Sequence, residues 1–138
     1  MTINLNPNRG NPGRMPGTVL DGIRLGYARI VSEDGAPAPC LRIERGGQFS
    51  IRLAVAAGAR TITAQAKQPV AAAARPVLRV RVNPAIGLNA DVTASATANL
   101  DWQPVSVTFT AASAGGVVVV LQNPDQQYPC WWDEIRVT

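Results

Sequence analysis

The sequence contains no histidine, and this absence removes several kinds of active site at once. Without an imidazole, the chain has no Ser-His-Asp or Cys-His catalytic arrangement and no zinc site that depends on histidine. It has only two cysteines, Cys40 and Cys130. Each begins a predicted strand, and no apolar segment of a signal peptide is visible at the N-terminus, so we expect two thiols and no disulfide.

Charge is also sparse, because only 16% of the residues are charged. Twelve arginines and Lys67 outweigh nine acids and give a net charge of +4. These cations are spread over many predicted strands instead of forming one patch, so we expect no nucleic-acid partner. The most hydrophobic run, residues 117–121, is far too short to cross a bilayer, and we expect no membrane partner.

What the chain does contain is alternation between apolar and polar residues. Its 138 residues suit one domain with one core, and eleven prolines with twelve glycines divide it into short segments. Residues 49–55, 61–67, 78–82 and 105–110 alternate with a period of two, which is typical of half-buried strands. About eight or nine such strands predict an all-β, two-sheet sandwich. The pairs Gly46-Gly47 and Gly115-Gly116 each predict a hairpin turn.

Residues 1–17 differ from the rest, because they combine three prolines and four asparagines with no acid. One interpretation is a floppy terminus. The other is an extended arm whose Arg9 and Arg14 reach a partner, since asparagine and proline favour defined turns. Either way, the sandwich domain is predicted to span residues 18–138.

The last eight residues, 131–138, predict a closing strand. Strict alternation places Trp131, Asp133, Ile135 and Val137 on one face, with Trp131 in the core. Trp132 then faces the other way, where it is in the core or covered by a loop, contacts a protein, or stacks on a sugar. Alternation also turns Asp133 and Glu134 to opposite faces, so they cannot form the carboxylate pair of a glycosidase.

Of the two other aromatic residues considered, only Tyr128 is a candidate for contact with a partner. Tyr128 lies in a polar loop beside Asp125, which suits contact with a protein or a sugar but is also ordinary for a loop. Trp102 opens a predicted strand and is interpreted as a plug at the end of the sandwich. The arginines at outward positions predict a solvated face, and the alternative is that part of this face meets an acidic partner; they are Arg42, Arg52, Arg79 and Arg81.

Several stretches resemble jelly-roll carbohydrate-binding modules over residues 18–138. In that group a tryptophan opens a strand ending in Phe-Thr, a glycine-led apolar strand follows, and the last strand pairs an aromatic residue with acids. The matching stretches are residues 101–110, 115–121 and 131–137, with weaker matches at residues 40–43 and 55–64. The resemblance implies a jelly-roll-like sandwich and allows a structural calcium at Asp133 with Asp21. Asn4-Leu5-Asn6-Pro7 is similar to the start of family members, but no Phe-Glu follows.

A single sandwich with a Pro/Asn-rich arm and no visible signal peptide also resembles small virion proteins of tailed phages. We therefore predict a non-enzymatic virion protein, assembled in the host cytoplasm, that decorates a phage capsid. Its partners would be the major capsid protein, other virion subunits or further copies of itself, bound through the arm and one sandwich face. The alternative is a carbohydrate-binding module with a glycan ligand. A weaker alternative is an accessory domain of a tail or adhesion assembly.

Overall fold

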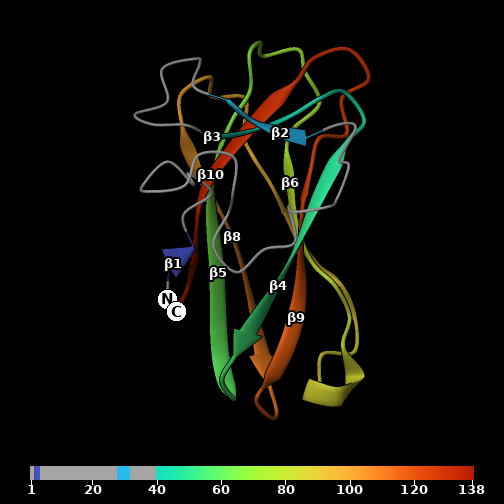
Figure 1. The fold of residues 1–138 in the computed structure, drawn as a ribbon, viewed down its shortest axis with the longest axis vertical. Helices are drawn as coiled ribbons and strands as arrows, with labels where there is room; N and C mark the ends of the chain where they lie inside the picture. The colour runs from blue at the N-terminus through green and yellow to red at the C-terminus, as the bar shows by residue number, and fades with distance from the viewer. Residues whose placement is uncertain (1, 4–27, 32–39) are drawn as a thin grey trace.

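The computed structural model describes residues 2–3, 28–31 and 40–138 (Figure 1). These residues form ten strands and one short 3-10 helix. The elements are β1 (Thr2–Ile3), β2 (Ala28–Val31), β3 (Cys40–Ile43), β4 (Gln48–Val55), β5 (Gly58–Lys67), β6 (Val77–Val80), η1 (Pro84–Ile86), β7 (Val92–Ser95), β8 (Gln103–Ala111), β9 (Gly115–Gln122) and β10 (Cys130–Val137).

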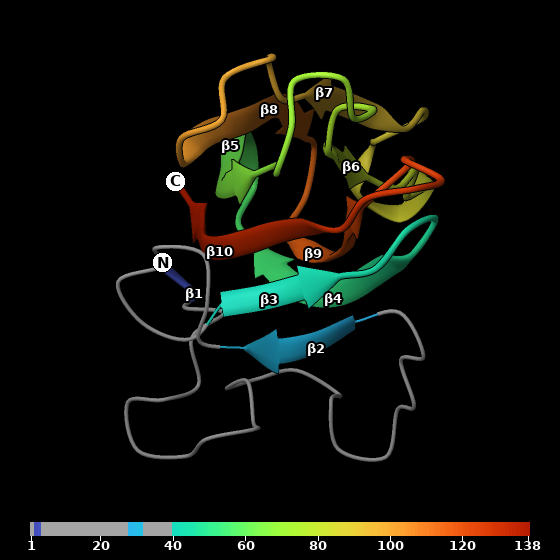
Figure 2. The ribbon, with the colours of Figure 1, turned by 90° about the horizontal axis from the view of Figure 1, so that it is seen from above.

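The strands are arranged in two antiparallel sheets. Sheet A has the order β2-β3-β10-β5-β8, and β1 adds to the end of β10. Sheet B has the order β4-β9-β6-β7. Figure 2 shows β2, β3 and β10 side by side in that order. The predicted all-β sandwich is therefore confirmed, and β10 lies inside sheet A with neighbours on both of its edges.

The alternation in the sequence produces the core directly. In β4, Phe49, Ile51, Leu53 and Val55 are buried while the residues between them are exposed. The same pattern in β8 buries Val105, Val107 and Phe109. Both sheets turn such faces inward, and β5, β6 and β9 add their own apolar rows to the same cluster. Burial of these apolar side chains is the main force that holds the two sheets together.

The two glycine pairs do not form the predicted hairpins. The Gly46-Gly47 turn joins β3 of sheet A to β4 of sheet B, and the chain passes from β8 to β9 between the same two sheets. Gly46 has a φ of 67°, in the left-handed region that glycine adopts most easily. A glycine pair marks a reversal of the chain, but the pair alone does not determine whether the flanking strands hydrogen-bond to each other.

Gly115 in β9 provides a stability test with a matched control. A Cβ atom at Gly115 would lie 2.5 Å from Ile86 Cγ2, whereas one at Gly116 would meet nothing closer than Leu53 O at 3.9 Å. We expect Gly115→Ala to lower the free energy of unfolding by about 1–3 kcal/mol, the usual cost of overpacking. Gly116→Ala should change it little. Urea denaturation of both variants checks this, and equal losses would contradict the close packing of η1 on β9.

Two further predictions from the sequence can be compared with the structure. Residues 117–121 are apolar at both odd and even positions, which is to say on both faces of the strand. Val120 is fully buried although it lies on the outer face of sheet B. The pattern of residues 92–98 predicts a weak, polar strand at an edge, and the shorter strand β7 (Val92–Ser95) lies at the edge of sheet B. In the part of the chain that the structure describes, no helix is long and apolar enough to cross a membrane.

Candidate functional site

A β-bulge interrupts β10 at the centre of sheet A. Asp133 lies opposite Gln65 of β5 and Arg136 lies opposite Thr63, so Glu134 and Ile135 together face a single residue of β5. Glu134 adopts a φ of 49°, and no other described residue apart from glycine has a positive φ. A bulge of this kind inserts one extra residue and shifts the side-chain alternation by one position.

The bulge overturns the predicted faces of the closing strand. Before the bulge, Cys130 and Trp132 face the core; after it, Ile135 and Val137 do. Trp132 is 0% exposed and belongs to the hydrophobic core. Trp131 is buried as predicted, at 5% exposed, but it lies outside the cluster between the sheets, which contains Trp132 instead. Trp132 therefore offers no surface for a protein or a sugar. The predicted and observed faces differ because the strand contains one extra residue, which strict alternation does not allow for.

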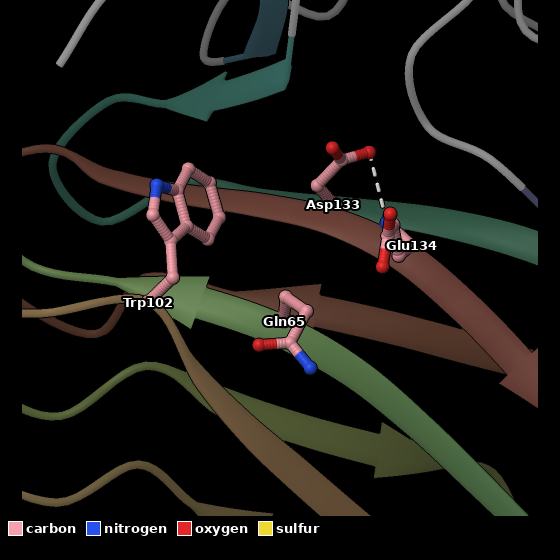
Figure 3. A pocket seen from close by; sticks show the side chains of 4 residues that line it. All are labelled: Gln65, Trp102, Asp133 and Glu134. Atoms are coloured by element: carbon pink, nitrogen blue, oxygen red, sulfur yellow. Dashed lines mark hydrogen bonds between the residues drawn. The ribbon is translucent and has the colours of Figure 1, made fainter. Parts of the chain in front are cut away.

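The bulge also places two carboxylates on the same face. Asp133 and Glu134 both line a pocket of about 260 Å³ on the outside of sheet A, together with Gln65 and Trp102. The prediction that these two acids point to opposite faces is therefore wrong. In Figure 3, Trp102 stands on one side of the pocket, Asp133 and Glu134 stand on the other, and Gln65 rises from β5 between them.

Trp102 is positioned by the residue that follows it. The side-chain amide of Gln103 is buried, and its Oε1 accepts hydrogen bonds from the backbone N–H and hydroxyl of Thr97, at 2.8 and 2.9 Å. Its Nε2 donates to the backbone oxygens of Thr97 and Asn99. These four bonds hold the loop before β8. The indole Nε1 of Trp102 has no acceptor among the described residues, so packing and the loop hold the ring in place.

The two carboxylates are held in different ways. Asp133 is only 6% exposed, and one of its oxygens accepts the backbone N–H of Glu134 at 2.8 Å, which stabilises the bulge. Glu134 is half-buried and pairs with Arg136 at 3.3 Å. Both acids approach the pocket from the same side (Figure 3), whereas the two carboxyls of a glycosidase flank the scissile bond. The arrangement suits recognition of hydroxyl groups better than hydrolysis.

Trp131 lies on the outer face of sheet A, opposite Lys67 of β5. The Arg42 guanidinium is 5.8 Å from the centre of the Trp131 ring, a distance at which a cation–π interaction is significant. Arg42 also pairs with Glu44 at 2.6 Å. Arg42 is therefore on sheet A, while Arg52, Arg79 and Arg81 are on sheet B, so the arginines predicted to share a solvated face are divided between two faces.

Tyr128 lies in the loop between β9 and β10 and is absent from the lining of the pocket. This loop has a structural role. The buried amide of Asn123 donates to the backbone oxygens of Ile43, Glu44 and Tyr128. The carboxylate of Asp125 accepts backbone N–H groups, first of all those of Ala74 and Tyr128, and these bonds lower the pKa of Asp125. Contact of Tyr128 with a partner stays a prediction.

Other predicted site residues lie outside the described residues. These are Arg9 and Arg14 of the proposed arm and Asp21 of the proposed calcium site. Among residues 2–3, 28–31 and 40–138, no group of three or more Asp, Glu, Cys or His side chains could hold a metal ion. Calcium at Asp133 with Asp21 therefore stays a prediction.

Both cysteines are buried and form no disulfide with each other. In the antiparallel pair of β3 and β10, Cys130 lies opposite Ile43 at the far end of β3 from Cys40. Burial raises the pKa of the Cys130 thiol far above its usual range. The predicted pair of thiols is confirmed, and Cys130 is unsuited to act as a nucleophile.

Comparison with solved structures supports a fold shared with sugar-binding domains. A family 16 carbohydrate-binding module aligns with 89% of this chain and 96% of its own, with a TM-score of 0.64 and 20% identity. The CBM22-1 xylan-binding domain of Paenibacillus barcinonensis Xyn10C covers 99% of this chain and 91% of its own, with a TM-score of 0.59 and 14% identity. No protein-family model matches the sequence, and no curated protein matches it.

Some similar modules are parts of larger enzymes. The structure of the CBM22-1 and GH10 modules of a Clostridium thermocellum xylanase, in complex with xylohexaose, matches 81% of this chain at a TM-score of 0.55 and 14% identity. The match covers 24% of that longer chain. At these identities the likeness shows the fold alone. It agrees with the predicted jelly-roll sandwich, while the capsid-decoration role gains no support and stays a prediction.

Proposed function

We propose that this chain is a non-catalytic carbohydrate-binding domain and that its ligand site is the pocket of Trp102, Gln65, Asp133 and Glu134. The observation that carries the proposal is the bulge, which turns two consecutive carboxylates toward one aromatic side chain. The solved structures with this fold include a xylan-binding domain and a pair of CBM22-1 and GH10 modules in complex with xylohexaose, and they support a carbohydrate ligand.

The four side chains supply the contacts that a sugar requires. A sugar ring has an apolar face of C–H groups, which packs on the indole of Trp102. Its hydroxyls donate hydrogen bonds to Asp133 and Glu134, and charge-assisted bonds of this kind are about twice as strong as neutral ones. The amide of Gln65 both donates and accepts, so it serves a hydroxyl in either role. Two carboxylates at one side also disfavour an anionic sugar, because like charges repel.

A panel of immobilised neutral polysaccharides tests the proposal. Xylan, β-1,4-galactan, mannan and a β-glucan would be compared by affinity electrophoresis, with bovine serum albumin as a protein that should not be retarded. We expect at least one of these glycans to slow the protein, and the bound oligosaccharide to perturb NMR signals of Trp102 and Gln65. Absence of retardation by every neutral glycan would remove the proposal.

Capsid decoration requires different evidence, because it depends on the arm and on Arg9 and Arg14. The described residues neither favour nor oppose an arm. Carbohydrate binding therefore replaces capsid decoration as the leading function, since it has both a pocket and similar structures in its support.

A further inference from the structure

The outer face of sheet B carries a second set of polar side chains, with the opposite charge. Arg52 of β4 lies opposite Val118 of β9, and the backbone N–H of Arg81 donates to Val118 O from the other side at 2.9 Å. Arg52 and Arg81 therefore flank one residue at the same level of the sheet. Arg79 lies on the same face, opposite Val120.

One carboxylate serves this group of three arginines, and it is already occupied. Asp91 pairs with Arg79 at 3.0 Å through one oxygen and accepts the backbone N–H of Val82 at 2.7 Å through the other. These two bonds lower the pKa of Asp91, and the nearby charge of Arg81 contributes less. Among the described residues, neither Arg52 nor Arg81 forms an ion pair. Both side chains are exposed.

A pocket of about 330 Å³ lies beside these arginines. Its lining combines Arg52 and Asn83 with three valines and a glycine, and comprises Arg52, Val82, Asn83, Gly116, Val117 and Val118. Gly116 has no side chain, and a Cβ atom there would meet nothing closer than 3.9 Å, which leaves the surface hollow at this point. The pocket has the volume typical of a small-ligand site.

The surroundings of the arginines favour a glycan over a protein. The adjoining rows of the same face carry amides and hydroxyls, including Gln48, Gln122 and Ser50. Protein interfaces also use arginines, but they combine them with buried aromatic anchors. The exposed large hydrophobic residues among those described are only Val82 and Leu100. Polar side chains around two unpaired guanidinium groups suit a ligand that carries hydroxyls and carboxylates together.

We infer that the outer face of sheet B binds an acidic glycan whose carboxylates pair with Arg52 and Arg81. Guanidinium groups bind carboxylates through paired hydrogen bonds, and the hydroxyls of the same chain reach Gln48, Gln122 and Asn83. This site is independent of the Trp102 pocket, because it lies on the opposite sheet and requires an anionic ligand, whereas the Trp102 pocket favours a neutral one.

Binding to polygalacturonate, measured by isothermal titration calorimetry, tests the inference. We expect the protein to bind polygalacturonate, and to bind a neutral galactan much more weakly at this face. The affinity for polygalacturonate should fall as the salt concentration is raised. Arg52→Gln and Arg81→Gln should each weaken binding by about fivefold, as expected for one exposed ion pair. Arg45→Gln removes the same charge from an exposed turn and should leave the affinity unchanged.

Several results would overturn the inference. These are no binding of polygalacturonate, equal losses for Arg45→Gln and Arg52→Gln, or an affinity for polyglutamate that matches or exceeds that for polygalacturonate. The last result would identify an acidic protein as the partner. Trp102→Ala should leave polygalacturonate binding intact, so failure at this face and failure at the Trp102 pocket are distinguishable. Melting temperatures of the variants verify that each one is folded.

Discussion

Replacing Trp102 with alanine should weaken binding of the neutral glycan that the protein retains by about thirtyfold. Truncating an aromatic anchor of a binding site typically costs about 2 kcal/mol or more. Trp102 provides the aromatic surface of the pocket, and Gln65, Asp133 and Glu134 provide hydrogen bonds around it. Calorimetric titration of the wild-type protein and the variant with the same oligosaccharide measures the effect.

Tyr128→Ala is the matched control for this experiment. Tyr128 is half-buried like Trp102, and the sequence suggests it as a sugar contact, yet it is absent from the pocket lining. We expect its replacement to leave glycan affinity within about twofold of the wild-type value, since a twofold change is about 0.4 kcal/mol. If Tyr128→Ala abolished binding while Trp102→Ala did not, the ligand would lie at the loop between β9 and β10 instead.

Trp132→Ala should produce the largest loss of stability, about 3–5 kcal/mol in the free energy of unfolding. Removing a large aromatic side chain from a core costs both its transfer free energy and the cavity that remains. Trp132 is 0% exposed and packs in the cluster that joins the two sheets. Because small domains are stable by about 5–15 kcal/mol in total, this change removes a large share. Urea denaturation followed by circular dichroism measures it.

A conservative variant keeps this test informative if Trp132→Ala fails to fold. Trp132→Phe retains most of the apolar contact and should cost less than Trp132→Ala. Trp102→Ala, which removes a half-buried ring, should cost less than either. A loss below about 1 kcal/mol for Trp132→Ala would contradict its place in the core, since surface substitutions have effects of that size.

Regular alternation explains why the sequence predicts most of the sandwich correctly. In β4 and β8 every second residue is buried without interruption, so the strands and their inward faces follow from the pattern alone. Glycine pairs identify two of the reversals, but the fold uses them to pass between sheets. That choice depends on how the sheets pack, which involves residues far apart in the sequence.

The candidate site could not be predicted from the sequence because it depends on the bulge in β10. Nothing in Trp131-Trp132-Asp133-Glu134 signals an extra residue, and the usual sequence sign of a left-handed conformation, glycine, is absent at Glu134. The extra residue shifts the alternation by one position. As a result Trp132 instead of Trp131 faces the core between the sheets, and the two acids lie on the same face. Gln65 and Trp102 lie near the two acids only because β5 pairs with β10 on one edge and with β8 on the other. No local sequence pattern predicts this pairing.

The role of the bulge can be tested by deleting Glu134. Arg136 already lies opposite Thr63 and Val137 opposite Ile62, so removing the extra residue leaves the pairing after the bulge in the same register. Trp132, Ile135 and Val137 would still face the core, while the pocket would lose its second carboxylate and the turn that directs Asp133. Glu134→Gln retains the bulge and serves as the control for the loss of charge alone.

Titration of the retained neutral oligosaccharide into the wild-type protein, the Glu134 deletion and Glu134→Gln therefore tests the central claim most directly. The bulge-assembled pocket predicts a folded deletion variant whose affinity falls at least about tenfold, a loss of roughly 1.4 kcal/mol, with a smaller loss for Glu134→Gln. A folded deletion variant that binds the oligosaccharide as tightly as the wild-type protein would contradict it.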